Sequence, residues 1–169
     1  MLFRSGTGSG AIALSIADAL PNALVIASDR SMAALDVARE NARLLGLEER
    51  VRFVHGNLVE WLGGAVDIIA ANLPYIPSEL IQQLPREVRD YEPHLALDGG
   101  PGGSVLNLKL LQQAAARLHP GGGIMLECEP DQIPTLRTTA AATGCWEDIE
   151  AVLDGFGHPR FFQARRTRS

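Results

Sequence analysis

The residues Asn72, Leu73, Pro74 and Tyr75 place an amide, a proline-stiffened turn and an aromatic ring side by side. The Asn72 side-chain oxygen and the backbone carbonyl of Leu73 can each accept a hydrogen bond from an N–H group. The Tyr75 ring can stack on a planar group. This combination predicts a site that holds a flat, neutral amide or amino nitrogen while that nitrogen attacks an electrophile.

A second group of candidate residues is a glycine-rich loop near the amino end, formed by Gly6, Thr7, Gly8, Ser9 and Gly10. Glycines at a strand-to-helix junction let a ligand approach the backbone closely, and the helix amino end offers unpaired N–H groups. Gly6, Gly8 and Ala11 also fit the dinucleotide-binding pattern G-x-G-x-x-A. We therefore expect this loop to bind a nucleotide-containing cofactor, either NAD or S-adenosylmethionine.

Three further candidates follow predicted strands. Asp29 lies 19 residues after Gly10, where a carboxylate can accept hydrogen bonds from both ribose hydroxyls. Its alternative role is that of a turn or capping residue before a helix. Asn57 can bond an adenine amine and Leu58 can pack on the adenine face. The alternative for this pair is an ordinary turn asparagine and a core leucine.

The elements that must position these residues alternate between strand and helix. Strands are predicted at residues 1–5, 23–28, 51–54, 65–71, 124–128, 146–153 and 160–164, and helices at residues 11–20, 32–45, 106–118 and 134–143. Segment 65–71 is typical of a parallel strand buried on both faces, and residues 119–123 predict a turn. The order predicts one α/β domain over residues 1–169, with a doubly wound, mostly parallel sheet and an antiparallel carboxyl-terminal strand. Ligands of such sheets bind at the carboxyl ends of the strands, where both motifs lie.

Composition narrows the class of protein. The chain has 169 residues, the size of one domain, and 46% of them are hydrophobic. A net charge of −5 argues against broad nucleic-acid binding. The basic residues 165, 166 and 168 predict a solvated tail. Cys128 and Cys145 form neither a disulfide framework nor a zinc site, so we expect two core thiols in a reduced cytoplasmic protein without a metal. No signal peptide or membrane span is visible.

The two cofactors differ in what else the site must supply. Hydride transfer to or from NAD usually needs a general acid such as His or Lys. None of the four histidines lies in a strand-end motif that suggests this role. The Asn72 motif has no evident task in hydride transfer but suits methyl transfer to nitrogen, so the pattern favours S-adenosylmethionine.

Taken together, the chain resembles the HemK/PrmC family of protein-glutamine methyltransferases from residue 6 to about residue 165. The resemblance rests on Asp29 and on segments 6–14, 38–42, 72–77, 87–93, 98–103 and 120–122. The motif at 72–75 alone is shared with adenine-N6 and other amino methyltransferases. Together with Tyr91-Glu92-Pro93 and segment 96–100 it is specific to this family.

The resemblance implies a Rossmann-like, S-adenosylmethionine-dependent methyltransferase fold and a glutamine side-chain amide as methyl acceptor. The usual target is the Gly-Gly-Gln loop of a peptide chain release factor, and a sister group modifies a ribosomal protein. By motif, residues 6–10 line the methionine part of the cofactor, Asp29 holds the ribose, and Asn57 and Leu58 flank the adenine. Residues 72–75 bind the glutamine, and Asn72 also borders the cofactor. We expect a cytoplasmic monomer that binds neither membrane nor nucleic acid directly.

Three departures from the family pattern stand out. Arg4 occupies a place that is usually acidic, and Ser5 replaces an apolar residue, so the first strand looks short or altered. The family's amino-terminal helical domain is absent from the sequence. Leu73 replaces the first proline of the motif but keeps the carbonyl that the proposed contact uses, and Pro74 still favours an extended geometry at residue 73.

Three alternatives stay open. One is an adenine-N6 nucleic-acid methyltransferase, which shares the Asn72 motif. Another is a truncated fold with impaired cofactor binding and no activity, which Arg4 and Ser5 favour. A dehydrogenase is the third.

Overall fold

The fold is built on one seven-stranded sheet with the strand order β3-β2-β1-β4-β5-β7-β6. The computed structural model describes residues 1–168. The strands are β1 Leu2–Ser5, β2 Val25–Asp29, β3 Val51–His55, β4 Val66–Ala71, β5 Leu118–Glu127, β6 Trp146–Leu153 and β7 Pro159–Arg166. Strands β1 to β5 pair in parallel, whereas β7 runs antiparallel to both β5 and β6. The predicted α/β fold with a mostly parallel sheet is confirmed.

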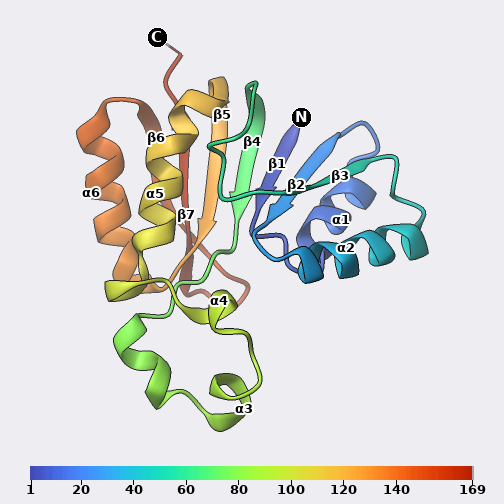
Figure 1. The fold of residues 1–169 in the computed structure, drawn as a ribbon. Coiled ribbons are helices and arrows are strands. Elements are labelled where there is room, and N and C mark those ends of the chain that lie inside the picture. Colours follow the sequence, from blue (N-terminus) through green and yellow to red (C-terminus); the bar gives the residue numbers. More distant parts are fainter. Residues whose placement is uncertain (169) are drawn as a thin grey trace.

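The helices are distributed over the two faces of the sheet (Figure 1). The longer ones are α1 Ala11–Ala19, α2 Met32–Leu45, α5 Val105–Ala114 and α6 Ile133–Thr143. Short helical segments are η1 Ser78–Gln83, α3 Arg86–Arg89, α4 His94–Leu97, η2 Pro101–Gly103, η3 Ala115–Arg117 and η4 Pro130–Gln132. The ends of α2 follow from local sequence: the Ser31 side chain accepts a hydrogen bond from the Ala34 amide at 3.2 Å, and Gly46 ends the helix with a φ of 66°.

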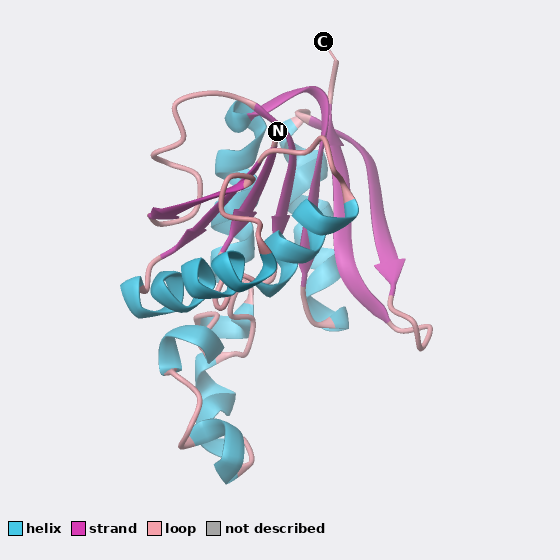
Figure 2. Ribbon diagram, turned by 90° about the vertical axis from the view of Figure 1, so that its right-hand side faces the viewer, coloured by secondary structure: helices cyan, strands magenta, loops and turns pink. Residues whose placement is uncertain are grey.

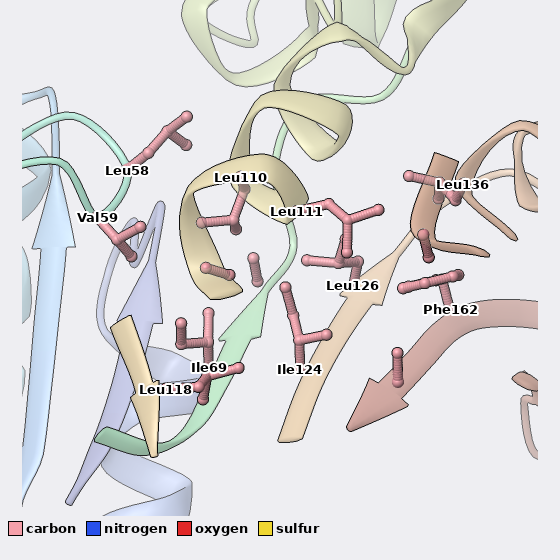
Figure 3. Close-up of a cluster of buried hydrophobic side chains, with 14 of the residues drawn as sticks. Leu58, Val59, Ile69, Leu110, Leu111, Leu118, Ile124, Leu126, Leu136 and Phe162 are labelled. Carbon is pink, nitrogen blue, oxygen red and sulfur yellow. The ribbon is translucent and has the colours of Figure 1, made fainter. Parts of the chain in front are cut away.

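Two hydrophobic cores form because successive residues of β1 point to opposite faces. Phe3 belongs to the larger core, which α5 and α6 cover, and Leu2 belongs to the smaller core, which α1 and α2 cover. Figure 3 shows the larger core, in which Leu110 and Leu111 of α5 lie against Ile124 and Leu126 of β5. These cores fix the sheet against the helices and leave the carboxyl ends of the strands for the site.

Strand β4 is covered on only one face, so the prediction that it is buried on both faces is wrong. Ile69 is fully buried. Its neighbour Ile68, whose side chain points to the opposite face of the sheet, is 43% exposed. Helices α1 and α2 lie over the β1–β3 half of the sheet and do not reach across β4 (Figure 1). Met125 of β5 is exposed on the same uncovered face. Gly123 of β5 is the register partner of Ile68, and Met125 lies two residues after Gly123, so its side chain points to the same side as that of Ile68.

Three other expectations need correction. Residues 119–123 belong to β5, where they form an irregularity opposite residues 66–68 of β4, and are not a simple turn. Arg165 and Arg166 lie in β7 and bond Gly121 and Leu118 by their side chains, so these two are not part of a solvated tail, whereas Arg168 lies beyond β7 and is exposed. Cys128 is buried as expected, but Cys145 is exposed because it lies in the turn between α6 and β6.

The segment from η1 to α4 extends beyond the carboxyl edge of the parallel strands (Figures 1 and 2). Its two ends are joined at its base, where Ile76 and Asp98 form an isolated parallel bridge. The Asp98 carboxylate accepts hydrogen bonds from the Ser78 hydroxyl at 2.6 Å and from the Gly100 amide at 2.8 Å. These bonds hold the pKa of Asp98 below its ordinary value and fix both ends of the extension.

Candidate functional site

The order of the strands reverses between β1 and β4, and the site lies at this point. In open α/β sheets a crevice forms beyond the carboxyl ends of the two strands where the chain crosses in opposite directions. The glycine loop follows β1 and the Asn72 motif follows β4, and these two strands are hydrogen-bonded neighbours. Both predicted motifs therefore start from the same edge of the sheet.

The glycine loop is held by hydrogen bonds to the neighbouring strand β2. The Thr7 amide donates to the Ser28 carbonyl at 2.9 Å, and the Gly8 amide donates to Asp29 Oδ2 at 2.8 Å. Gly6 has a φ of 63°, a left-handed conformation that favours glycine. A Cβ on Gly6 would lie 2.8 Å from Cδ2 of Leu73, so any larger residue here would force the Leu73 side chain to shift.

Asp29 fills the turn role that was its alternative interpretation. Its Oδ1 accepts a hydrogen bond from the Ser31 amide at 2.9 Å, while Oδ2 is bonded to the Gly8 amide. Each carboxylate oxygen can accept more than one hydrogen bond, so these contacts leave acceptor capacity toward the cleft, which Asp29 lines. The turn role and a ligand role are therefore compatible.

A cleft of about 760 Å³ brings most of the predicted site residues together, a size within the range of ligand sites. Its lining includes Gly6, Thr7, Gly8, Ser9, Asp29, Asn57, Leu58, Asn72, Leu73, Pro74 and Tyr75. Gly10 is not part of the lining; its α-carbon faces Ala38 of α2 instead. Leu58 and Leu73 are almost fully buried and also belong to the larger core, so each forms part of the floor of the cleft.

Arg4 is a buried cation at the base of this cleft. It is 3% exposed and lines the cleft at the end of β1. Its Nη1 donates to the Ser5 carbonyl, but its Nε has no hydrogen-bond partner. Burial lowers the pKa of Arg4 to about 10, and the charges of Glu127 and Asp29 partly oppose this change. The base of the cleft thus carries a buried positive charge.

Tyr75 is surrounded by polar residues that the sequence did not single out. Arg160 Nη2 donates to the phenol oxygen at 2.9 Å, and the hydroxyl donates to Glu127 Oε1 at 3.3 Å. The Gln132 amide donates to the Tyr75 backbone carbonyl at 2.8 Å. Burial, with the charge of Glu127 adding to it, raises the pKa of the Tyr75 phenol, so the group is neutral at physiological pH.

The remaining wall of the cleft comes from the end of the projecting segment, including Glu92, Pro93 and Leu95. Gly103 closes the back of this wall: a Cβ there would lie 2.1 Å from the Tyr75 carbonyl oxygen. A Cβ on Gly99 would lie 2.8 Å from the Tyr75 α-carbon, so Gly99 and Gly103 both let this loop pack directly against residue 75.

Neither a metal-binding cluster nor a membrane-spanning helix is found in the described part of the chain. No group of three or more His, Cys, Asp or Glu side chains within residues 1–168 is arranged to hold a metal ion. No helix in the same range combines the length and the apolar character needed to cross a bilayer.

Comparison with known sequences gives consistent matches. A family described as "Methyltransferase domain" matches residues 4–91, just over half of the chain. A release factor glutamine methyltransferase of Moorella thermoacetica is 48% identical over 162 residues, which is 95% of this chain and 57% of that protein. One of Bradyrhizobium diazoefficiens is 42% identical over 161 residues, covering 95% of this chain and 54% of that protein. The chain thus spans about half the length of the curated relatives it matches.

Solved structures match nearly the whole fold. A methyltransferase from Pyrococcus furiosus superposes with a TM-score of 0.72 at 18% identity and covers 99% of this chain and 75% of that one. TrmN from Thermus thermophilus has a TM-score of 0.68 at 28% identity and covers 98% and 43%. At the identity of the first match, the likeness supports the fold alone.

Proposed function

The chain belongs to the methyltransferase-domain family, and from this premise we propose that it methylates the side-chain amide nitrogen of a glutamine in a protein. S-adenosylmethionine is the cofactor. The observation that carries the proposal is the placement of residues 72–75 in the same cleft as the glycine loop. This arrangement puts hydrogen-bond acceptors for an amide beside a loop suited to a nucleotide-containing donor.

The residues of the cleft fit the adenosine part of the cofactor. Gly8 lines the cleft, and a Cβ built on it meets nothing within 4 Å, so space is open directly above the loop. The Thr7 hydroxyl is buried without a partner and is free to bond a ligand. Asp29 would accept hydrogen bonds from the ribose, and Asn57 with Leu58 would border the adenine. At the amino-acid end, Arg4 would attract the carboxylate and repel the ammonium and sulfonium charges.

When bound, S-adenosylmethionine would supply a methyl group attached to a positively charged sulfur, and the sulfur would keep the electron pair of the broken C–S bond and leave as a neutral thioether. The chain's own residues would act mainly by position. Asn72 Oδ1 and the Leu73 carbonyl would accept the two amide N–H groups of the glutamine and direct its nitrogen. The same two oxygens would stabilise the positive charge that grows on nitrogen as the N–C bond forms. The nitrogen then loses one of its protons to solvent, which leaves a neutral N-methyl amide.

Tyr75 would pack against the planar amide and does not serve as a base in this proposal. Its hydroxyl is occupied as donor to Glu127 and as acceptor from Arg160. Its raised pKa also keeps it protonated. A neutral acceptor site of this kind suits an amide, which carries no charge to be matched.

The proposed protein substrate is a peptide chain release factor, with its Gly-Gly-Gln loop entering the cleft. The support is the name of the curated relatives, of which this chain spans about half. An adenine in a nucleic acid is the second candidate, because residues 72–75 would hold an amino group in the same way. The negative net charge of −5 disfavours it.

The test is a methyl-transfer assay with labelled S-adenosylmethionine and mass spectrometry of the acceptor. We expect one added methyl group on the glutamine of a Gly-Gly-Gln release factor fragment, and none when this glutamine is replaced by Asn. Methylation of an adenine-containing oligonucleotide in place of the protein would overturn the substrate assignment. A calorimetric titration with S-adenosylmethionine, run in parallel, separates failure to bind the cofactor from failure to recognise the acceptor.

A further inference from the structure

The side chain of Tyr75 lies inside a network of charged residues that come from distant parts of the chain. Arg160 is the second residue of β7, and Glu127 ends β5, so both lie at the edge of the sheet where the cleft opens. Arg160 is itself anchored by an ion pair from Nη1 to Glu129 Oε2 at 2.9 Å. Its guanidinium carbon lies 5.4 Å from the centre of the Tyr75 ring, within the range of a cation–π contact.

These contacts define the orientation of the ring at both of its ends. The phenol oxygen accepts from Arg160, and its hydrogen is directed to Glu127, so both hydrogen-bonding functions of the hydroxyl are used. At the backbone, Gln132 fixes the Tyr75 carbonyl. Arg160 and Glu127 are each about three-quarters buried at the side chain, where water competes less with these bonds.

We propose that Arg160 is a positioning residue for the acceptor, which acts by holding the Tyr75 ring in one orientation on the wall of the cleft. Arg160 does not line the cleft, so its effect passes through Tyr75. Arginine suits this role because its planar group donates several hydrogen bonds in fixed directions while it stacks on a ring. The effect on methyl transfer rests on the proposed function, whereas the contact with Tyr75 can be tested without it.

The experiment compares Arg160→Met with a matched control, Arg165→Met. Arg165 lies on the same strand, but it pairs with Asp148 at 3.7 Å and makes no recorded contact with Tyr75. The chain has two tyrosines, so protein labelled with ¹³C at the ring carbon that bears the hydroxyl gives two NMR signals. Tyr91 is 83% exposed, and the variant Tyr91→Phe assigns the signal of Tyr75.

We expect Arg160→Met to move the Tyr75 signal and to raise the pH at which it titrates, because the cation that favours the phenolate is removed. Arg165→Met should do neither. An unchanged Tyr75 signal in Arg160→Met would overturn the proposed contact. This readout needs no substrate, so it decides the contact even if the parent chain methylates nothing, a result that would count against the proposed function instead.

In the methylation assay we expect Arg160→Met to reduce kcat/KM for the release factor fragment by roughly 10–100-fold, the scale of a displaced positioning group. The dissociation constant of S-adenosylmethionine should stay the same, as should both values in Arg165→Met. Arg160→Lys keeps the charge but not the planar donor, so its kcat/KM should lie between those of Arg160→Met and Arg165→Met. The same variant replaces Arg160→Met in the assay if Arg160→Met does not fold. A moved NMR signal with unchanged kinetics would refute the positioning role.

Discussion

Replacing the buried Arg4 with Met should stabilise the protein. The guanidinium is 3% exposed and its Nε lacks a partner, so the charge loses hydration on folding without full compensation. Burial lowers its pKa well below the ordinary value of an arginine, to about 10, which corresponds to about 3 kcal/mol at about 1.4 kcal/mol per pKa unit. Met keeps an unbranched apolar stem in the same space and brings no charge.

The direction in which this stability cost changes with pH follows from proton binding. At neutral pH Arg4 is charged in both the folded and the unfolded chain, but only the folded chain holds the charge away from water. The full cost is therefore present below about pH 10 and decreases above it, as the folded protein loses this proton before the unfolded chain does. Replacement of buried ion pairs by apolar residues of similar volume is often neutral or stabilises proteins by about 1–4 kcal/mol, which sets the scale for Arg4→Met.

Urea unfolding at pH 7, followed by circular dichroism, measures this change. The midpoint of Arg4→Met should rise with an unchanged slope, and Tm should rise by about 2–4 °C for each kcal/mol. Arg52→Met, on an exposed position of β3, is the control and should change stability by no more than about 0.5 kcal/mol. If Arg4→Met were no more stable than the parent chain, the buried charge would have a compensation that the structure does not contain.

Three further predictions concern the two ends of the cleft. Asn72→Ala should lower the methylation rate by roughly 10²–10³-fold, while calorimetry shows nearly unchanged cofactor binding; full activity would refute the acceptor role. Asp29→Ala should weaken S-adenosylmethionine binding by about 10–100-fold, through loss of hydrogen bonds to a charged acceptor, and an unchanged dissociation constant would exclude the ribose contact. Gly6→Ala should impair both cofactor binding and methylation, since its Cβ would lie 2.8 Å from Leu73 Cδ2. Gly8→Ala has a similar positive φ but no protein atom within 4 Å of the added Cβ, so the free energy of unfolding without cofactor should fall more in Gly6→Ala; an equal fall in both variants would show that backbone strain, and not the contact with Leu73, is responsible.

The elements that the sequence predicts well are those with local causes. Helix α2 starts at the Ser31 cap and ends at Gly46, and both residues act through their own backbone geometry and nearest neighbours. The same is true of the hairpin between β6 and β7, where the Asp154 carboxylate accepts hydrogen bonds from the Phe156 and His158 amides, each at 2.9 Å. Such signals are complete within a few residues and can be read without knowledge of the fold.

The expectations that fail depend on what lies across the sheet. Ile68 is as apolar as Ile69, yet only one of them is covered, because the helices do not extend over both faces of β4. The charge of Arg165 and Arg166 predicts tail residues, but the pairing of β7 with β5 and β6 places them in the sheet. Neither outcome is encoded in the segment itself.

The residues of the candidate site also fall into two groups, those that local sequence predicts and those that depend on the pairing of distant strands. The residues of the cleft lie in contiguous motifs and could be predicted from strand ends and glycine spacing. The polar residues around Tyr75 could not, because Arg160 is 85 residues away in sequence and Glu127 is 52 away. Their side chains have ordinary sequence neighbours, and only the pairing of β5 with β7 brings them to the same place.

The relative placement of donor and acceptor follows from the sheet itself. Ser5 of β1 and Ala71 of β4 are register partners, so Gly6 and Asn72 are the first residues beyond two neighbouring strands at the same level. Strands in a sheet lie about 4.8 Å apart, and the missing side chain at Gly6 lets Leu73 pack underneath the glycine loop. The two walls of the cleft therefore touch at their base and are spaced by backbone hydrogen bonds. Under the proposed function, the distance over which a methyl group would pass is therefore set by β1 and β4, and not by the projecting segment 78–97, which lines the cleft only through its last residues.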